Sequence, residues 1–228
     1  MMKVIDVAGI QLDNCTVREA IMCLDREISD QGFHTIEEVN TDTLMLATTN
    51  DSVRTALMAM EHTVISEVAV LEAVGADSYQ RRREVEHHDF FYELMRRIER
   101  NRKKLCLIGG ESAKVQKMEE LLLARFPRCE LVSYALEDFE GKADSLVNEV
   151  NVVTPDVILS ILPSPQQEEF LLENKDRLSA NLWYGIGSMN PEVQRRGILG
   201  LIQRLIRTRK LERQLDSFRQ ESVEDEQK

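Results

Sequence analysis

KKLCLIGGESAKVQKMEELLLARFPR, residues Lys103–Arg128, carries the clearest pattern of secondary structure in the chain. A short apolar run, Leu105–Ile108, stops at Gly109 and Gly110, and apolar residues then recur at spacings of three and four. This pattern predicts a strand, a tight turn and a helix with Ser112 as its N-cap, which is half of a βαβ unit. Such a turn directs backbone N–H groups at whatever lies above it, which favours a phosphate group. No named phosphate fingerprint is present, so a plain strand-to-helix connection is the alternative.

Composition bounds the class of protein. The chain has 228 residues, enough for one large α/β domain or two lobes around a cleft. Its formal net charge of −11 argues against non-specific nucleic-acid binding. The four cysteines have no metal-binding spacing, which fits a reducing cytoplasm. There is no signal peptide and no run of roughly 20 apolar residues, so we expect a protein that is soluble or lies on a membrane.

Strand and helix patterns alternate along most of the chain. After a predicted hairpin at Lys3–Leu12 and a helix opened by the capping box Thr16–Glu19, Tyr79–His88 is expected to be a surface loop. Alternating elements of this length predict an α/β fold that is Rossmann-like, with a mostly parallel sheet and helices on both faces. The predicted strands are His34–Val39, Thr63–Leu71, Leu105–Ile108, Glu130–Ala135, Pro155–Leu162 and Asn181–Ile186.

Ligands of such sheets bind beyond the carboxyl ends of the strands. The predicted ends lie at Asn40, Glu67, Gly109–Gly110, Pro163–Gln167 and Gly187–Asn190. These five places are where we expect the functional residues.

Several motifs in this order resemble the WecG/TagA/CpsF family of bacterial glycosyltransferases. Pro155–Glu168, PDVILSILPSPQQE, is similar to the family's P-D-x-x-x-x-x-L-G-x-P-x-Q-E stretch, and Gly185–Gly187 is similar to its G-x-G turn. The likeness runs from about Ile5 to about Leu211. The other matching stretches are Ile5–Leu24, Glu38–Asn40, Leu105–Gly110 and Gly197–Leu205.

The resemblance implies transfer of an N-acetylmannosamine-like sugar from a UDP-sugar to a polyprenyl-diphosphate-linked acceptor. A metal-independent transfer needs a carboxylate to deprotonate the acceptor hydroxyl and cationic or N–H groups to stabilise the leaving diphosphate. No Asp-x-Asp pair follows a strand, so no metal and no cofactor is expected. Residue by residue, the resemblance implies catalytic roles for Glu67, Asn40 and Gln167, and substrate binding by Gly109, Gly110, Asp89, Arg83, Pro165, Gly185 and Gly187.

Three acidic residues depart from the family's motifs. Glu67 replaces the catalytic Asp, Glu38 replaces a Thr, and Glu84 replaces the Arg of a loop in which Asp89 is kept and Arg83 lies one place away. A like charge 4 Å from a diphosphate would cost roughly 4 kcal/mol at an effective dielectric constant near 20. These substitutions leave a second interpretation open: a non-catalytic member that binds a nucleotide sugar or a partner protein.

The C-terminal region is basic and then acidic. Residues 195–213 carry seven Arg or Lys and one Glu, and Arg204, Arg207 and Lys210 flank an apolar stripe. A basic amphipathic helix of this kind can lie on an anionic bilayer, where a lipid-linked acceptor would be found. The alternative is a helix that docks on its own domain or on a partner subunit.

These observations predict a glycosyltransferase-like α/β domain at residues 1–190, with lobes at about 1–102 and 103–190 around a cleft. Residues 191–228 would form a C-terminal basic amphipathic helix and an acidic tail. The expected partners are a UDP-sugar, a polyprenyl-diphosphate-linked acceptor and an anionic membrane surface, without nucleic acid. The expected location is the cytoplasm or the inner face of the cell membrane. Formation of a homo-oligomer is left open.

Overall fold

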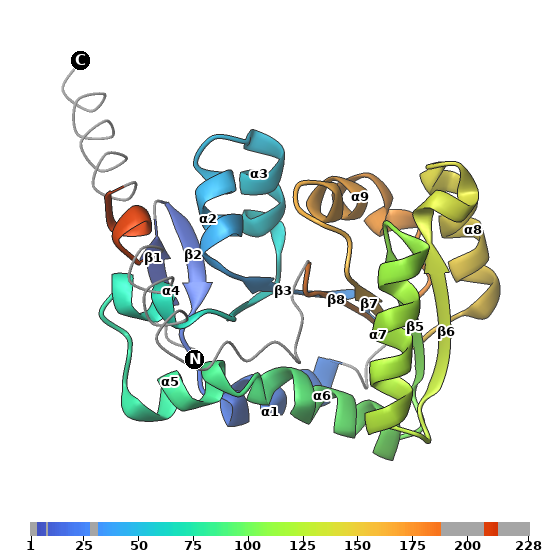
Figure 1. Ribbon diagram of the computed structural model, residues 1–228, viewed down its shortest axis with the longest axis horizontal. Helices are drawn as coiled ribbons and strands as arrows, with labels where there is room; N and C mark the ends of the chain where they lie inside the picture. The colour runs from blue at the N-terminus through green and yellow to red at the C-terminus, as the bar shows by residue number, and fades with distance from the viewer. Residues whose placement is uncertain (1–3, 8, 28–31, 188–207, 214–228) are drawn as a thin grey trace.

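The computed structural model describes residues 4–7, 9–27, 32–187 and 208–213 (Figure 1). Its centre is a parallel six-stranded sheet in the order β4-β3-β8-β7-β5-β6. The apolar runs form the strands, and the central ones are buried on both faces, as is usual in parallel sheets. The strands are β3 (His34–Val39), β4 (His62–Ile65), β5 (Lys104–Gly109), β6 (Glu130–Ala135), β7 (Val157–Ser160) and β8 (Leu182–Gly185).

Helices cover both faces of the sheet (Figure 1). On one face, α1 (Val17–Glu27), α6 (Asp89–Arg100) and α7 (Ser112–Arg125) pack on Ile36, Leu107 and other side chains. On the other face, α8 (Ala143–Val153) and α9 (Gln166–Asn174) pack around Trp183 and Ile158. Short 3-10 turns at Leu136–Phe139 and Lys175–Arg177 follow β6 and α9. The α/β class and the βαβ unit at Lys103–Arg128 are therefore confirmed.

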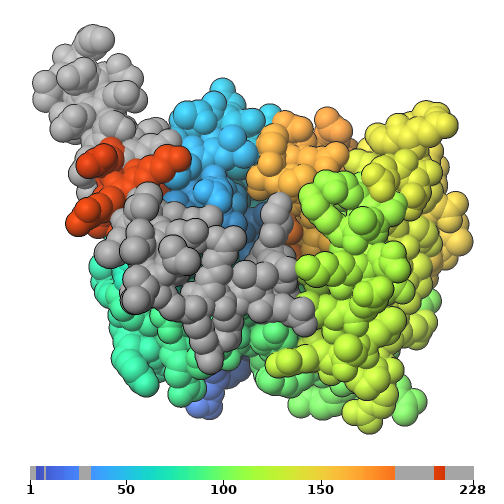
Figure 2. All heavy atoms as spheres, viewed as in Figure 1, coloured from blue at the N-terminus to red at the C-terminus, as the bar shows by residue number. Residues whose placement is uncertain are grey.

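A third cluster covers the β4 edge of the sheet. The antiparallel hairpin of β1 (Val4–Val7) and β2 (Ile10–Asp13) lies there, as predicted. Reciprocal bonds between the backbone N–H groups and the side chains of Asp13 and Thr63 tie β2 to β4. Against this cluster pack the helices α2 (Thr41–Ala47), α3 (Asp51–Ala59), α4 (Val68–Ala73) and α5 (Tyr79–Glu86). In the space-filling view the chain up to α5, blue to teal, and the chain from α7 to β8, yellow-green to orange, form opposite sides of the molecule (Figure 2).

Three local predictions were wrong. The expected strand Thr63–Leu71 ends at Ile65, and α4 follows, because a short buried apolar run does not distinguish strand from helix. The expected loop Tyr79–His88 is mostly the helix α5, which Ser78 caps by accepting a bond from the Arg81 N–H. Ser112 is not an N-cap: Glu111 holds that position, and Ser112 is the first residue of α7. The strand predicted at Pro155–Leu162 is two residues shorter at each end in the structure, where β7 spans Val157–Ser160.

The C-terminal basic segment is described only in part. Arg204 and Arg207 lie outside the described residues, whereas residues 208–213 are helical and Lys210 is exposed. Leu211 is buried against the hairpin cluster, and the Thr208 hydroxyl donates to Glu72 3.0 Å away. These six residues therefore dock on their own domain. Among the described helices, none has the length and apolar character needed to cross a bilayer.

Candidate functional site

The carboxyl edge of the sheet has a switch point between β5 and β7. The chain leaves β5 through α7 on one face, whereas it leaves β7 through α9 on the other. The two loops therefore separate at this point and leave a crevice, which is where open α/β sheets bind ligands. Gly109 is needed here, because a Cβ on it would lie 2.6 Å from a Val115 methyl carbon.

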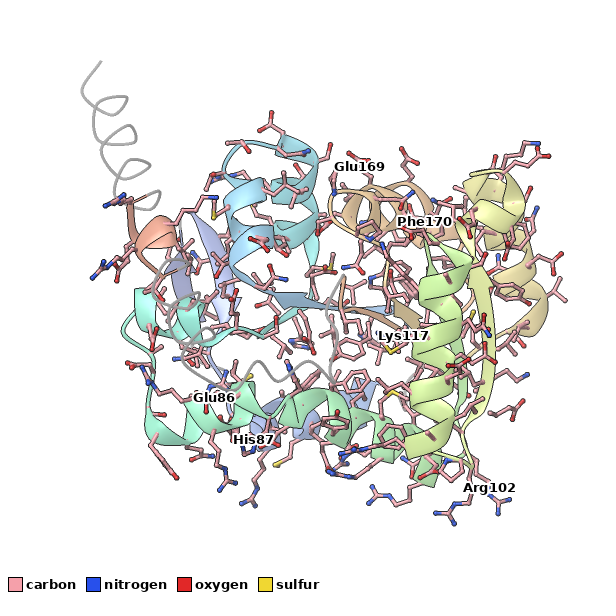
Figure 3. All side chains as sticks on the ribbon, viewed as in Figure 1. Glu86, His87, Arg102, Lys117, Glu169 and Phe170 are labelled. Carbon is pink, nitrogen blue, oxygen red and sulfur yellow. The ribbon has the colours of Figure 1, made fainter. Side chains whose placement is uncertain are left out.

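A groove of about 670 Å³ lies over this switch point. Its size is within the range of small-molecule sites, which is roughly 300–1,000 Å³. Lys117 lies on the flank of α7 that lines the groove (Figure 3). The other residues that matter for its chemistry are Gly110, Lys114, Glu137, Pro163, Gln166 and Gly187.

The N-terminus of α7 is occupied by acidic side chains of the chain itself. Glu137 accepts a bond from the Ser112 N–H at 2.6 Å, and Asp138 accepts one from the Ser112 hydroxyl at 2.8 Å. The bonds from the side chain and backbone of Ser112 hold the pKa of Glu137 below its ordinary value. Glu137 thus takes the position predicted for a phosphate. A diphosphate bound over Gly109–Gly110 would have to displace this carboxylate or lie beside it.

Gln167 is at the centre of a closed network on the α9 face. Its Oε1 accepts from the Gly187 N–H at 3.1 Å, and its Nε2 donates to Glu37. Gly185 leaves room for both partners, because a Cβ there would overlap Glu37 and lie 2.8 Å from Gln167 Nε2. Burial raises the pKa of Glu37 well above its ordinary value, and the charge of Glu168 raises it further. Glu37 and Gln167 are each 1% exposed, so this network is interior.

Glu38 points to the opposite face of the same strand. Its Oε1 accepts a bond from the Tyr184 hydroxyl, and its Oε2 has no hydrogen-bond partner in the described part of the chain. Burial raises the pKa of this carboxyl to about 7, although the bond from Tyr184 opposes the rise. Glu38 lines a cavity of about 20 Å³ together with Asp13, Cys15, Ser66, Arg81, Glu84 and His88. That volume holds about one water molecule.

Asn40 and Glu67 meet at the start of α2. Asn40 caps this helix by accepting from the Thr43 N–H at 2.9 Å, while Glu67 Oε2 accepts from the Thr41 N–H at 3.0 Å. The strand ends after β3 and β4 are adjacent because Val39 pairs with Ile65. The two predicted catalytic side chains therefore bind the backbone of the same helix.

The whole sheet and its switch point match one known family. Residues 5–190 match the glycosyl transferase WecG/TagA/CpsF family. The chain belongs to this family of glycosyltransferases. Among its curated relatives are the N-acetylglucosaminyldiphosphoundecaprenol N-acetyl-beta-D-mannosaminyltransferases of three Staphylococcus aureus strains (NCTC 8325 / PS 47, COL and N315). Each is 20% identical over 190 residues, which is 80% of this chain and 72% of the relative.

The residues predicted from the glycosyltransferase motifs fall into separate places. Gly110 and Gly187 line the groove, and Pro165 stands at the N-cap position of α9. Arg83 and Asp89 instead line a different surface groove of about 820 Å³, formed with side chains of α1 and α6, which shares no lining residue with the first. Within the described residues, no group of three His, Cys, Asp or Glu side chains is placed to hold a metal ion.

Glu37 and Tyr184 were missed by the sequence reasoning, and Glu38 was noted only as a departure from the glycosyltransferase motifs. Two consecutive glutamates inside a strand that is buried on both faces were a visible signal, because such strands are otherwise apolar. Their partners were not visible, since Gln167 and Tyr184 are 130 and 146 residues away in the sequence.

Proposed function

We propose that this protein transfers an N-acetylmannosamine-like sugar from a UDP-sugar to a polyprenyl-diphosphate-linked acceptor in cell-envelope polysaccharide or teichoic-acid-type synthesis. The observation that carries the proposal is the family match over residues 5–190, which spans all six strands and both loops of the switch point. The names of the relatives supply the sugar and the lipid-linked acceptor.

The groove over Gly109 and Gly110 is the proposed donor site. It is large enough for a nucleotide sugar, and Lys114 and Lys117 supply positive charge along α7. Lys114 already forms a pair with Glu111 at 2.6 Å, whereas Lys117 has no ionic partner among the described residues. Lys117 is therefore the better placed of the two to balance charge on a leaving diphosphate, without any metal ion in the proposal.

The proposed acceptor site lies nearer β3 and β4, around Asn40 and Glu67. Glu67 was predicted as the base that takes the proton of the acceptor hydroxyl, and that role stays a prediction. Its carboxylate accepts the Thr41 N–H, which anchors it at the sheet edge.

A non-catalytic family member is the second candidate. It is favoured by the position of Glu137, which fills the N-terminus of α7 with a negative charge. A protein of this kind would bind a nucleotide sugar weakly, or only a partner protein.

One experiment separates the two candidates. The full chain is titrated with UDP-N-acetylmannosamine and UDP-N-acetylglucosamine, and UDP release is then measured with a soluble lipid-diphosphate-linked acceptor. We expect binding and acceptor-dependent UDP release. Binding without release identifies the non-catalytic member, and the absence of binding at millimolar ligand rejects both nucleotide-sugar proposals. Lys117→Glu should abolish binding, whereas Lys175→Glu, the same charge change at an exposed position outside the groove, should not.

A lipid-linked acceptor implies contact with the inner face of the cell membrane. Arg204, Arg207 and Lys210 are the proposed contacts, since polybasic segments bind anionic lipid by about 1 kcal/mol per charge. Reversal of all three charges to Glu should release the protein from phosphatidylserine vesicles in sedimentation. The matched control reverses the exposed Arg100, Arg102 and Lys175, of which Arg102 projects from the far end of the molecule (Figure 3). Equal sedimentation of the two variants would reject the membrane contact.

A further inference from the structure

Glu38 is a carboxyl group with half of its hydrogen-bonding capacity unused. It is 5% exposed, its Oε1 is held by Tyr184, and its Oε2 is buried without a partner in the described residues. Tyr184 is itself fixed, because its ring packs edge-on against Phe90 with centroids 5.6 Å apart. A buried acceptor without a partner is destabilising, so it is kept only where something else is gained.

The space beside Glu38 has both apolar and polar groups in its wall and is of a definite size. The cavity of about 20 Å³ has room for one water molecule or for one hydroxyl group of a ligand. Arg81 also lines it, and the buried Nε–H of Arg81 likewise has no partner within the described part of the chain. The cavity walls thus contain an unused acceptor and an unused donor. A hydroxyl group satisfies both, because its oxygen accepts and its hydrogen donates.

The other acids that face this cavity are already engaged. Glu84 accepts from Arg81 Nη1 at 2.8 Å and from the Val17 N–H at 3.2 Å. Asp13 accepts from the Thr63 N–H at 3.1 Å and lies 3.5 Å from the His62 ring. Glu38 is the acid of this group that has a fully buried oxygen without a partner in the described residues.

We propose that Glu38 is the proton acceptor of the transfer reaction and that its cavity receives the reacting hydroxyl group of the acceptor. This inference rests on the proposed transferase function. The acceptor oxygen attacks the anomeric carbon of the donor sugar, and the bond from that carbon to the UDP oxygen breaks. The electron pair of that bond leaves with UDP, and the hydroxyl proton passes to Glu38 Oε2, from which it is later released to water.

The titration of Glu38 suits this role. Its pKa of about 7 leaves a large fraction ionised at neutral pH, which is the condition in which a general base is most effective. The neighbouring groups do not compete. Burial raises the pKa of the Cys15 thiol to about 11, and burial lowers the pKa of His88, so both are neutral there. Asp13, Glu84 and Arg81 also face the cavity, and Tyr184 faces Glu38 from β8.

This assignment replaces the prediction of Glu67 as the base, and Glu67 then acts as a positioning residue. Its carboxylate holds the Thr41 N–H at the start of α2 and so fixes the turn that follows β3. Loss of the Glu67 charge should weaken transfer because Asn40 and Glu38 would be less well positioned. The base that titrates, Glu38, would still be present.

The test is the pH dependence of UDP release by the full chain and by four variants. For the wild type, kcat/KM should rise with pH through an apparent pKa near 7. Glu38→Gln should lower kcat by about 10² to 10⁴ and abolish this rise. The rise of kcat/KM with pH should remain in Glu67→Gln and in Glu37→Gln. The second of these is a matched change on the opposite face of β3. Tyr184→Phe should move the rise to higher pH, because the lost bond favoured the ionised carboxylate.

Several results would overturn the inference. A Glu38→Gln variant that keeps kcat within about threefold of the wild type, or keeps the rise near pH 7, excludes Glu38 as the base and leaves the transferase function intact. If Glu38→Gln does not fold, as judged by fluorescence of the buried Trp183, an unshifted pH profile in Tyr184→Phe excludes it instead. Absence of transfer by the wild type with either donor rejects the proposed function, and this inference with it.

Discussion

Glu37 and Glu38 are consecutive residues of β3, yet they have opposite surroundings. Glu37 points toward α9 into a closed network. Gln167 donates to one of its oxygens, and the other lies so close to Gly185 that a Cβ there would overlap it. Glu38 points toward α5 and α6, where Tyr184 holds one oxygen and a cavity lies beside the other. Both carboxyls are buried, and burial raises the pKa of each. The free space, and not the burial, distinguishes the two.

The difference shows how one strand serves two purposes. Alternate side chains of a strand point to opposite faces, so a pair of adjacent residues can be divided between structure and chemistry. On the Glu37 side, Gln167 joins β3 to the Gly187 N–H and fixes the end of β8. On the Glu38 side, the fixed β8 presents Tyr184 to the carboxylate. The network around Glu37 therefore helps to hold Tyr184 in place beside Glu38.

The pH dependence of stability should give the largest effect. A carboxyl whose pKa is raised by folding stays protonated in the native state while the unfolded chain ionises, so stability falls as pH rises above the ordinary pKa of 4.5. For Glu38 the fall should end near pH 7 and amount to something on the order of 3 kcal/mol. For Glu37, whose pKa burial also raises, stability should likewise fall as pH rises above the ordinary value.

Urea unfolding followed by Trp183 fluorescence from pH 4 to pH 9 measures this. Relative to the wild type, both Glu38→Gln and Glu37→Gln should gain stability as pH rises above 4.5, and the gain of Glu38→Gln should level off near pH 7. Glu169→Gln, on the exposed side of α9, is the control and should run parallel to the wild type (Figure 3). A curve for either variant that runs parallel to the wild type would mean that folding does not raise the pKa of the carboxyl which that variant lacks.

Gly185→Ala should test how closed the Glu37 side is. The new Cβ would overlap Glu37 and lie 2.8 Å from Gln167 Nε2, and these side-chain ends are held by each other and by burial. We expect a loss of about 2 kcal/mol in the free energy of unfolding. Gly110→Ala is the control, since its Cβ meets Gln166 Oε1 at 3.3 Å in the partly exposed groove, and it should cost less than about 0.5 kcal/mol. Equal losses of unfolding free energy in the two variants would mean that Glu37 and Gln167 can shift to make room for the new Cβ.

Gln167→Ala should have a smaller effect of about 1 to 2 kcal/mol, because Glu37 and the Gly187 N–H would each lose a partner. The neighbouring Gln166→Ala provides the comparison and should be nearly neutral, since that side chain is partly exposed. The double variant Gly185→Ala, Gln167→Ala sharpens the result. Its total loss should be well below the sum of the single losses, because both changes break the same network. Simple additivity would argue against a shared network.

The sequence predicted the frame of this site better than its contacts. Alternating apolar runs gave five of the six strands within two residues at each end, and the strand ends brought Asn40, Glu67 and Gln167 to one edge of the sheet. The run after His62 was misread because its apolar residues suit a buried helix as well as a strand. The hydrogen-bond partners of the site residues could not be predicted, since they depend on loops whose course the sequence does not specify.

The three acids that replace family residues show this limit. From the sequence, Glu38, Glu67 and Glu84 looked alike: each would place a negative charge near the diphosphate. In the structure Glu84 is paired with Arg81, Glu67 binds the Thr41 N–H, and Glu38 has a pKa near 7. Each charge is therefore held in a different way, and Glu38 alone among the three combines a cavity with an oxygen that lacks a partner in the described residues.

Glu137 is a third kind of acid at the carboxyl edge of the sheet. Its substitution should give the smallest of the predicted effects. Unlike Glu37 and Glu38 it is exposed to solvent, and hydrogen bonds from Ser112 lower its pKa, so it is ionised at neutral pH. A negative charge at a helix N-terminus is favourable, and a bound diphosphate would compete for that position. Glu137→Gln should therefore tighten UDP binding by about threefold in calorimetric titration. Glu140→Gln, which lines the same groove without a bond to α7, should change affinity less. Weaker binding in Glu137→Gln would mean that this carboxylate contacts the nucleotide favourably, and that the diphosphate does not lie at the α7 N-terminus.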